Sequence, residues 1–170
     1  MRNKNVTMIT QGAIIAALYV VLTMIANALG LANYAIQVRF SEALCILPFF
    51  TLAAIPGLTI GCLISNILTG AMVWDVLFGS LATFLGAIGT YLLRKNKMLM
   101  MLPPVIANAV IVPLVLRYGY GLSWELNGVD WSVPYFAITV GIGEIISVCG
   151  LGGVLLKALL PYKNVIFKNN

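Results

Sequence analysis

The sequence predicts an all-α membrane protein that forms a single domain over residues 1–170, and its composition and patterning support this fold class. Hydrophobic residues make up 61% of the 170 positions and charged residues only 9%. A water-soluble domain of this length needs far more charged surface. Apolar runs of roughly 18 to 22 residues recur, and each can cross a hydrocarbon core about 30 Å thick. Because the alternating pattern of β-barrel strands is absent, we expect helices to span the bilayer.

Six apolar segments are predicted to cross the membrane, and breaks in the pattern separate them. Pro56-Gly57 marks a turn between the second and third spans. Pro48 is expected to kink or shorten the second span. The basic run Arg94–Lys97 precedes the fifth span, and the longest polar stretch, Arg117–Ser132, precedes the sixth. The predicted spans are residues 8–29, 38–52, 57–71, 76–93, 98–116 and 133–160.

Basic residues predict the orientation of these spans. Six crossings place both termini on one side, and all lysines and arginines except Arg39 and Arg117 fall on that side. These residues are Arg2, Lys4, Arg94, Lys95, Lys97, Lys157, Lys163 and Lys168. Since basic residues are enriched in cytoplasmic loops, both termini are expected in the cytoplasm. We therefore expect a multi-pass protein of the cell membrane, embedded in the lipid bilayer.

The available residue types argue against an enzyme. The chain has no histidine, which removes the commonest general base and metal ligand. The cysteines, Cys45, Cys62 and Cys149, have spacings that suit neither a zinc site nor a disulfide framework. No P-loop sequence is present, so the chain is not expected to bind ATP in that way. We expect no catalytic residue, no metal, no cofactor of its own and no nucleic-acid partner.

Charged residues within apolar segments are the candidate functional site, because an ionisable group in a bilayer costs at least a few kcal/mol. If their stretch is helical, Arg39 and Glu42 share one face and can bond each other or a polar ligand. Glu144 lies well inside the last span with no basic neighbour on its helix. Its partner is then Arg39, Asn108 or a ligand. The structural alternatives are a salt bridge for Arg39 and Glu42, a protonated Glu144 bonded to a backbone carbonyl, and an interhelical bond for Asn108.

Two further features concern packing and the membrane interface. The first span contains two pairs of small residues at helical spacing, Gly12/Ala16 and Ala13/Ala17, which let another helix approach closely. The 117–132 loop is rich in aromatic residues, including Trp131. Such residues suit an interface belt or a lid over a site.

One region resembles a known family. The run Val38-Arg39-Phe40-Ser41-Glu42-Ala43-Leu44, with Ile46–Phe50 and Ala54–Cys62, is similar to the hallmark region of the QueT family. The resemblance extends to Trp74-Asp75 and to the glutamate in the last span. Members of this family are S components, the substrate-binding subunits of energy-coupling factor (ECF) transporters, and are associated with uptake of queuosine precursors. The resemblance implies an S-component bundle that captures a deazaguanine, such as 7-aminomethyl-7-deazaguanine (preQ1).

The resemblance also implies partners. A membrane scaffold subunit and two cytoplasmic ATPases, which use the ATP, would drive transport, and the Ala13/Ala17 face would be the docking surface. S components of one fold bind unrelated vitamins. An S component for another vitamin or nucleobase therefore remains an alternative, as does a self-sufficient small-molecule carrier.

For a deazaguanine ligand, the polar residues have matching chemistry. Its N1–H and exocyclic amine lie side by side, so that the carboxylate of Glu144 or Glu42 can accept both. Its O6 suits an arginine or amide donor. The aminomethyl cation can pair with Asp75 or with the outer acids Glu125 and Asp130, and aromatic side chains of the 117–132 loop can stack on the ring. The candidate substrate-binding residues are Glu144, Arg39, Glu42, Asn108, Asp75 and Trp131.

Overall fold

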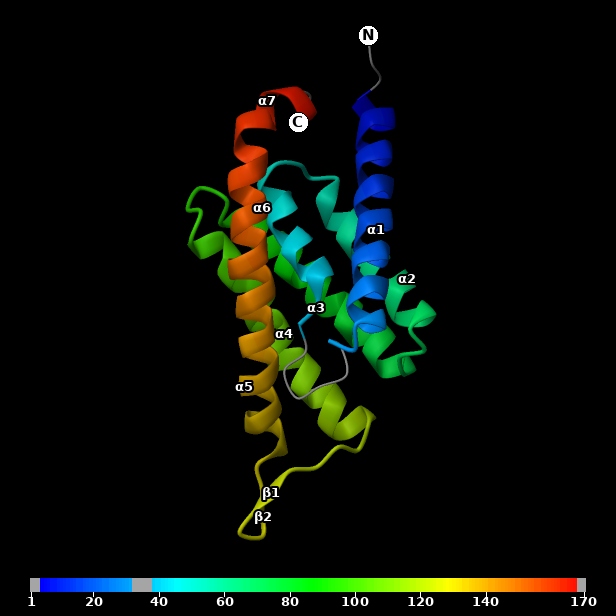
Figure 1. The fold of residues 1–170 in the computed structure, drawn as a ribbon, viewed down its shortest axis with the longest axis vertical. Helices are drawn as coiled ribbons and strands as arrows, with labels where there is room; N and C mark the ends of the chain where they lie inside the picture. The colour runs from blue at the N-terminus through cyan, green and yellow to red at the C-terminus, as the bar shows by residue number, and fades with distance from the viewer. Residues whose placement is uncertain (1–3, 32–37, 168–170) are drawn as a thin grey trace.

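The computed structural model describes residues 4–31 and 38–167, and Figure 1 shows a bundle of helices with a small hairpin at one end. The helices are α1 (Lys4–Ala28), η1 (Phe40–Phe49), α2 (Ala54–Leu68), α3 (Val73–Leu92), η2 (Leu99–Met101), α4 (Leu102–Leu114), η3 (Val115–Gly119), α5 (Ser132–Glu144), η4 (Ile145–Leu151), α6 (Gly152–Leu159), η5 (Leu160–Tyr162) and α7 (Lys163–Ile166). The strands are β1 (Glu125–Leu126) and β2 (Val129–Asp130). The predicted all-α class is confirmed.

Four helical segments are long and apolar enough to cross a membrane. They are Lys4–Ala28, Val73–Leu92, Leu99–Gly119 and Ser132–Tyr162. The helices in the second and third predicted spans are apolar but shorter than these four, with 10 residues in η1 and 15 in α2. The predicted turn at Pro56-Gly57 is wrong, because α2 begins at Ala54 and includes both residues. A perpendicular α-helical crossing needs about 20 residues. The multi-pass membrane class is therefore confirmed, whereas six crossings remain a prediction.

The second predicted span differs most from the sequence-based expectation. In place of the predicted span over residues 38–52, the chain forms a shorter 3₁₀-helix, η1, that includes Pro48 and ends at Phe49. Every residue from Ser41 to Pro48 is buried. Helices α1, α3 and α6 pack against η1, which lies among them in the bundle (Figure 1). This placement brings the polar residues at the start of η1 into the protein interior.

The small residues of α1 explain how closely α2 packs. A Cβ atom added to Gly57 would lie 2.7 Å from the carbonyl oxygen of Gly12, and one added to Gly61 would lie 3.0 Å from that of Ala16. Backbones can approach this closely only where side chains are absent or small. Helix α2 therefore packs against the Gly12/Ala16 pair inside the protein. Ala13 and Ala17 stay exposed on the other side of α1.

The β1–β2 hairpin is attached to the end of η3 by polar contacts. Arg117 forms a salt bridge with Asp130, with 2.8 Å between Nη2 and Oδ2. The backbone N–H of Ser132 donates to Asp130 Oδ1 at 2.9 Å, and the Ser132 hydroxyl donates to the same oxygen. The bonds from Ser132 lower the pKa of Asp130 most, and the contact with Arg117 lowers it further. The carboxylate therefore stays ionised at neutral pH, and the attachment weakens only as the pH falls through this lowered pKa.

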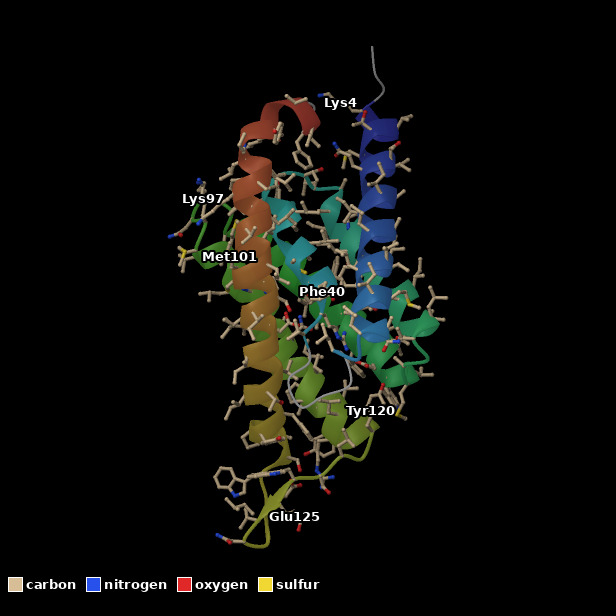
Figure 2. All side chains as sticks on the ribbon, viewed as in Figure 1. Lys4, Phe40, Lys97, Met101, Tyr120 and Glu125 are labelled. Atoms are coloured by element: carbon tan, nitrogen blue, oxygen red, sulfur yellow. The ribbon has the colours of Figure 1, made fainter. Side chains whose placement is uncertain are left out.

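Basic and acidic residues separate along the bundle. Lys4 and Lys97 lie toward the end where the chain begins and α7 lies, whereas Glu125 lies at the opposite, hairpin end (Figure 2). Arg2 and Lys168 of the predicted basic set fall outside the described residues. The same separation underlies the predicted orientation, in which the basic end faces the cytoplasm.

Cysteine labelling tests this orientation. Lys95→Cys and Glu125→Cys are suitable variants in a Cys149→Ala background, because both positions are exposed and the other cysteines, Cys45 and Cys62, are buried. A membrane-impermeant maleimide added to intact cells is expected to label the cysteine at position 125 and not the one at position 95. Permeabilised cells should show both labelled. Labelling of both positions from outside would contradict the orientation.

Candidate substrate-binding site

A polar cavity of about 310 Å³ lies between α1, α2, α3 and the segment that follows η3. Its volume is at the lower end of the range for small-molecule sites, which suits a small ligand. Arg39 and Asp75 bring charge to its wall, and most of the other lining groups are polar. The lining residues are Thr23, Asn27, Arg39, Asn66, Thr69, Gly70, Ala71, Asp75, Leu116, Tyr120 and Leu122.

Asp75 is held at the cavity by hydrogen bonds from two other segments. Asn66 Nδ2 donates to the Asp75 backbone carbonyl at 3.3 Å, and the Tyr120 hydroxyl donates to Oδ2 at 3.3 Å. Partial burial raises the pKa of Tyr120, so its hydroxyl stays a donor. The other carboxylate oxygen, Oδ1, is buried without a hydrogen-bond partner among the described residues. Arg39 and Asp75 place a positive and a negative group on the cavity wall, and the two interact electrostatically.

Glu42 lies behind this wall, and both its oxygens are bonded. The Tyr19 hydroxyl donates to Oε1, and the Cys45 thiol donates to Oε2 at 3.0 Å. Glu42 is only 1% exposed and does not line the cavity. Its bonds come from α1 and from its own helix, which makes Glu42 part of the contact between them.

Glu144 is the second buried carboxylate with an unbonded oxygen. It is the last residue of α5, where the backbone passes into the π-helix η4, and its Oε2 has no hydrogen-bond partner within the described structure. π-helical turns inside longer helices occur frequently at functional sites. Asn108 of α4 lies near enough to interact with the Glu144 carboxyl group, while its Nδ2 donates to the Pro104 backbone carbonyl at 3.2 Å. Arg39 and Glu42 both interact with it electrostatically.

The structure thus brings five of the six predicted residues into one cluster, which we call the buried charge cluster. It consists of Arg39, Glu42, Asp75, Asn108 and Glu144. Arg39 and Asp75 connect the cluster to the cavity, because both line it, whereas Glu42, Asn108 and Glu144 do not. Arg39 also interacts with all three acids.

Trp131 is the predicted residue that the structure places elsewhere. It is 49% exposed, precedes α5 beside the hairpin, and does not line the cavity. Tyr120, from the same loop, is the aromatic residue on the cavity wall. Asn66 and Tyr19 were not among the predicted residues. An amide inside an apolar helix was the available signal for Asn66, whereas Tyr19 has no distinguishing pattern around it.

A larger cavity of about 550 Å³ has different chemistry. It lies between α3 and α4–η3, and its wall contains Trp74, Phe78, Leu81, Leu114 and Tyr118 but no charged residue. Because it offers few polar groups to orient a ligand, it does not compete with the polar cavity as a site for a hydrophilic substrate.

Apolar helices long enough to span a bilayer, a polar cavity and a buried charge cluster are features of a multi-pass membrane transport protein. The comparison of sequences assigns the family: the model of the QueT transporter family matches residues 9–161, and the chain belongs to this family. The predicted resemblance is therefore confirmed. The family consists of transporters, which agrees with the expectation that the chain is not an enzyme.

Among curated proteins, the chain is similar to the queuosine precursor transporter QueT of Lactococcus lactis subsp. cremoris (strain MG1363). The two are 46% identical over 71 residues, which cover 42% of this chain and 41% of that protein. The matched segment thus spans about two fifths of the relative's length. No solved structure matches the chain.

Proposed function

We propose that this protein is the substrate-capture subunit of an ECF-type importer and that it binds preQ1 or a closely related deazaguanine. The observation that carries this proposal is a pair of buried carboxylate oxygens, Asp75 Oδ1 and Glu144 Oε2, that have no hydrogen-bond partner among the described residues. Buried polar groups are bonded in nearly all proteins, and an exception requires an explanation. A ligand rich in donors supplies one. The name of the Lactococcus relative gives the substrate class.

The charge balance of the cluster favours a ligand with donors and a positive charge. Three carboxyl groups, those of Glu42, Asp75 and Glu144, surround one guanidinium group, that of Arg39. The cluster therefore has more acceptors than donors. A deazaguanine offers two adjacent donors on its ring edge, and the aminomethyl group adds a cation.

Each group of the cluster then has a distinct role. Glu144 accepts the N1–H and the exocyclic amine, while Asn108 and Arg39 supply donors for O6. Asp75 pairs with the aminomethyl cation in a charge-assisted bond. The oxygens of Glu42 are already bonded by Tyr19 and Cys45, so Glu42 does not contact the ligand. Its role is to interact electrostatically with Arg39 and Glu144, which do.

The scaffold subunit is proposed to dock on the exposed face of α1 that contains Ala13 and Ala17. The exposure of this face, while the adjacent Gly12/Ala16 pair is covered by α2, supports the assignment. Small residues allow a partner helix to approach closely in lipid. The chain performs no catalysis in this account, and ATP is used by two ATPase subunits that bind the scaffold.

Reconstitution with and without the partners tests this division of labour. The purified chain in liposomes is expected to bind preQ1 but not accumulate it, and uptake should require the scaffold, the ATPases and ATP. Ala17→Trp should abolish assembly and uptake while leaving preQ1 binding within about twofold, because the bulky ring blocks close helix contact. Ile138→Trp is the matched control, since Ile138 is exposed on α5, away from this face. Uptake by the chain alone, driven by an ion gradient, would contradict the proposal.

A further inference from the structure

A third cavity lies at the basic end of the bundle, where Lys4 and Lys97 are found (Figure 2). Its volume is about 510 Å³, and it is lined by parts of α1, η1, the end of α3 with the turn after it, and α7. The transport mechanism proposed above assigns no role to this cavity. We call it the basic-end cavity.

Three cations lie on the wall of the basic-end cavity: Arg94, Lys95 and Lys163. The Arg94 guanidinium carbon is 3.8 Å from the centroid of the Tyr91 ring, and Lys163 Nζ is 5.1 Å from that of Phe49. Cation–π contacts of this kind position a cation without neutralising its charge.

No side-chain carboxylate balances these cations. The five acids of the chain lie in the buried charge cluster or on the hairpin segment, and the salt bridge found among the described residues joins Arg117 to Asp130. Among the described residues, the basic-end cavity therefore holds three positive charges without a side-chain counterion.

Most of the remaining wall, apart from Thr51 and the Tyr91 hydroxyl, is apolar, and this distinguishes the cavity from a simple surface patch. Met8, Phe49 and Leu52 contribute to it, and Met8 and Leu52 are also partly exposed on the outer surface of the bundle. The C-terminal segment closes one side, because Phe167 stacks on Phe50 with 4.9 Å between ring centroids. A ligand that fits both parts of the wall has an anionic head and an apolar tail.

The position of the cavity agrees with such a ligand. It lies beside the start of α1 and the end of α3, two helices long enough to span a membrane. In the predicted orientation, these helix ends are expected at the level of the cytoplasmic lipid headgroups. Basic pockets between membrane helices on the cytoplasmic side bind anionic headgroups. We propose that the basic-end cavity binds one anionic phospholipid, with its phosphate at Arg94, Lys95 and Lys163 and an acyl chain along Met8 and Leu52.

Native mass spectrometry of the full chain in a neutral detergent tests this proposal. Dioleoyl phosphatidylglycerol is expected to bind with roughly tenfold or greater preference over dioleoyl phosphatidylcholine, because the cations attract the anionic headgroup. The triple variant R94Q/K95Q/K163Q should lose this preference. The matched control K4Q/K97Q/K157Q removes the same charge from exposed lysines outside the cavity and should keep it.

Further arms of the experiment separate the possible ligands. Inorganic phosphate and glycerophosphoglycerol, which lack acyl chains, are expected not to displace the lipid at equal concentration. The single variant Lys163→Glu should weaken phosphatidylglycerol binding more than Lys97→Glu does. This pair of single variants tests the same site if the triple variant does not fold. Equal loss in both triple variants would overturn the proposal, as would displacement by phosphate. Retained lipid preference in R94Q/K95Q/K163Q, with loss of scaffold assembly, would assign the cations to a protein partner and also overturn it.

Discussion

Replacing Glu144 with glutamine is expected to weaken preQ1 binding by roughly a hundredfold or more, the largest effect we predict for a single residue. The substitution removes an acceptor oxygen and places an amide donor opposite the donors of the ligand. An unsatisfied buried donor costs about 1–3 kcal/mol, and more when a charged group is involved. Glutamine has nearly the same shape as glutamate, so the packing of the side chains around position 144 should change little.

Titration calorimetry on purified protein measures this effect, and Glu125→Gln is its matched control. Glu125 is an exposed residue of the hairpin, outside the cavity and the buried charge cluster. Its replacement should leave the dissociation constant within about twofold, as is usual for surface substitutions. If Glu144→Gln bound preQ1 as tightly as the parent protein while keeping its thermal stability, Glu144 would not contact the ligand.

Replacing Asp75 with asparagine is expected to discriminate between two ligands. Asp75 lies on the cavity wall, where Asn66 bonds its backbone carbonyl and Tyr120 bonds its carboxylate. Its Oδ1 has no hydrogen-bond partner in the described part of the chain. Only the aminomethyl cation gains a charge-assisted bond from this group. Binding of preQ1 should therefore fall roughly tenfold or more beyond any loss for its neutral cyano analogue.

The comparison of the two ligands on one variant controls for changes in protein structure. A general distortion of the cavity weakens both ligands equally, whereas loss of an ion pair weakens only the cation. Equal losses for preQ1 and the cyano analogue in Asp75→Asn would place the aminomethyl group elsewhere. The outer acids Glu125 and Asp130 would then be the next positions to replace.

The features that could be predicted from the sequence depend on the cost of charge in a membrane. Hydropathy is sufficient to place long apolar helices, because a bilayer leaves few alternatives to helical crossings. The same cost explains why Arg39, Asp75 and Glu144, which are far apart in the chain, lie in one cluster. Charges in an apolar interior are tolerated mainly where they interact with each other or with a ligand.

The features that could not be predicted depend on tertiary packing. Hydropathy does not distinguish a full span from a short helix buried by its neighbours, so the ten-residue helix η1 was expected to be longer. The position of Trp131 outside the cavity, and of Tyr120 on its wall, depends on how the loop folds against α3. The bond between Tyr19 and Glu42 joins α1 to η1, and a pattern along either segment does not reveal it.

The central claim, that this chain alone captures a deazaguanine, is tested most directly by calorimetry with a panel of ligands. The purified protein in detergent is titrated with preQ1, its cyano analogue, guanine, thiamine and biotin, without partner subunits or ATP. The account predicts tight binding of preQ1, weaker binding of the cyano analogue and guanine, and no binding of thiamine or biotin. Tight binding of thiamine or biotin, with none for any deazapurine, would contradict it.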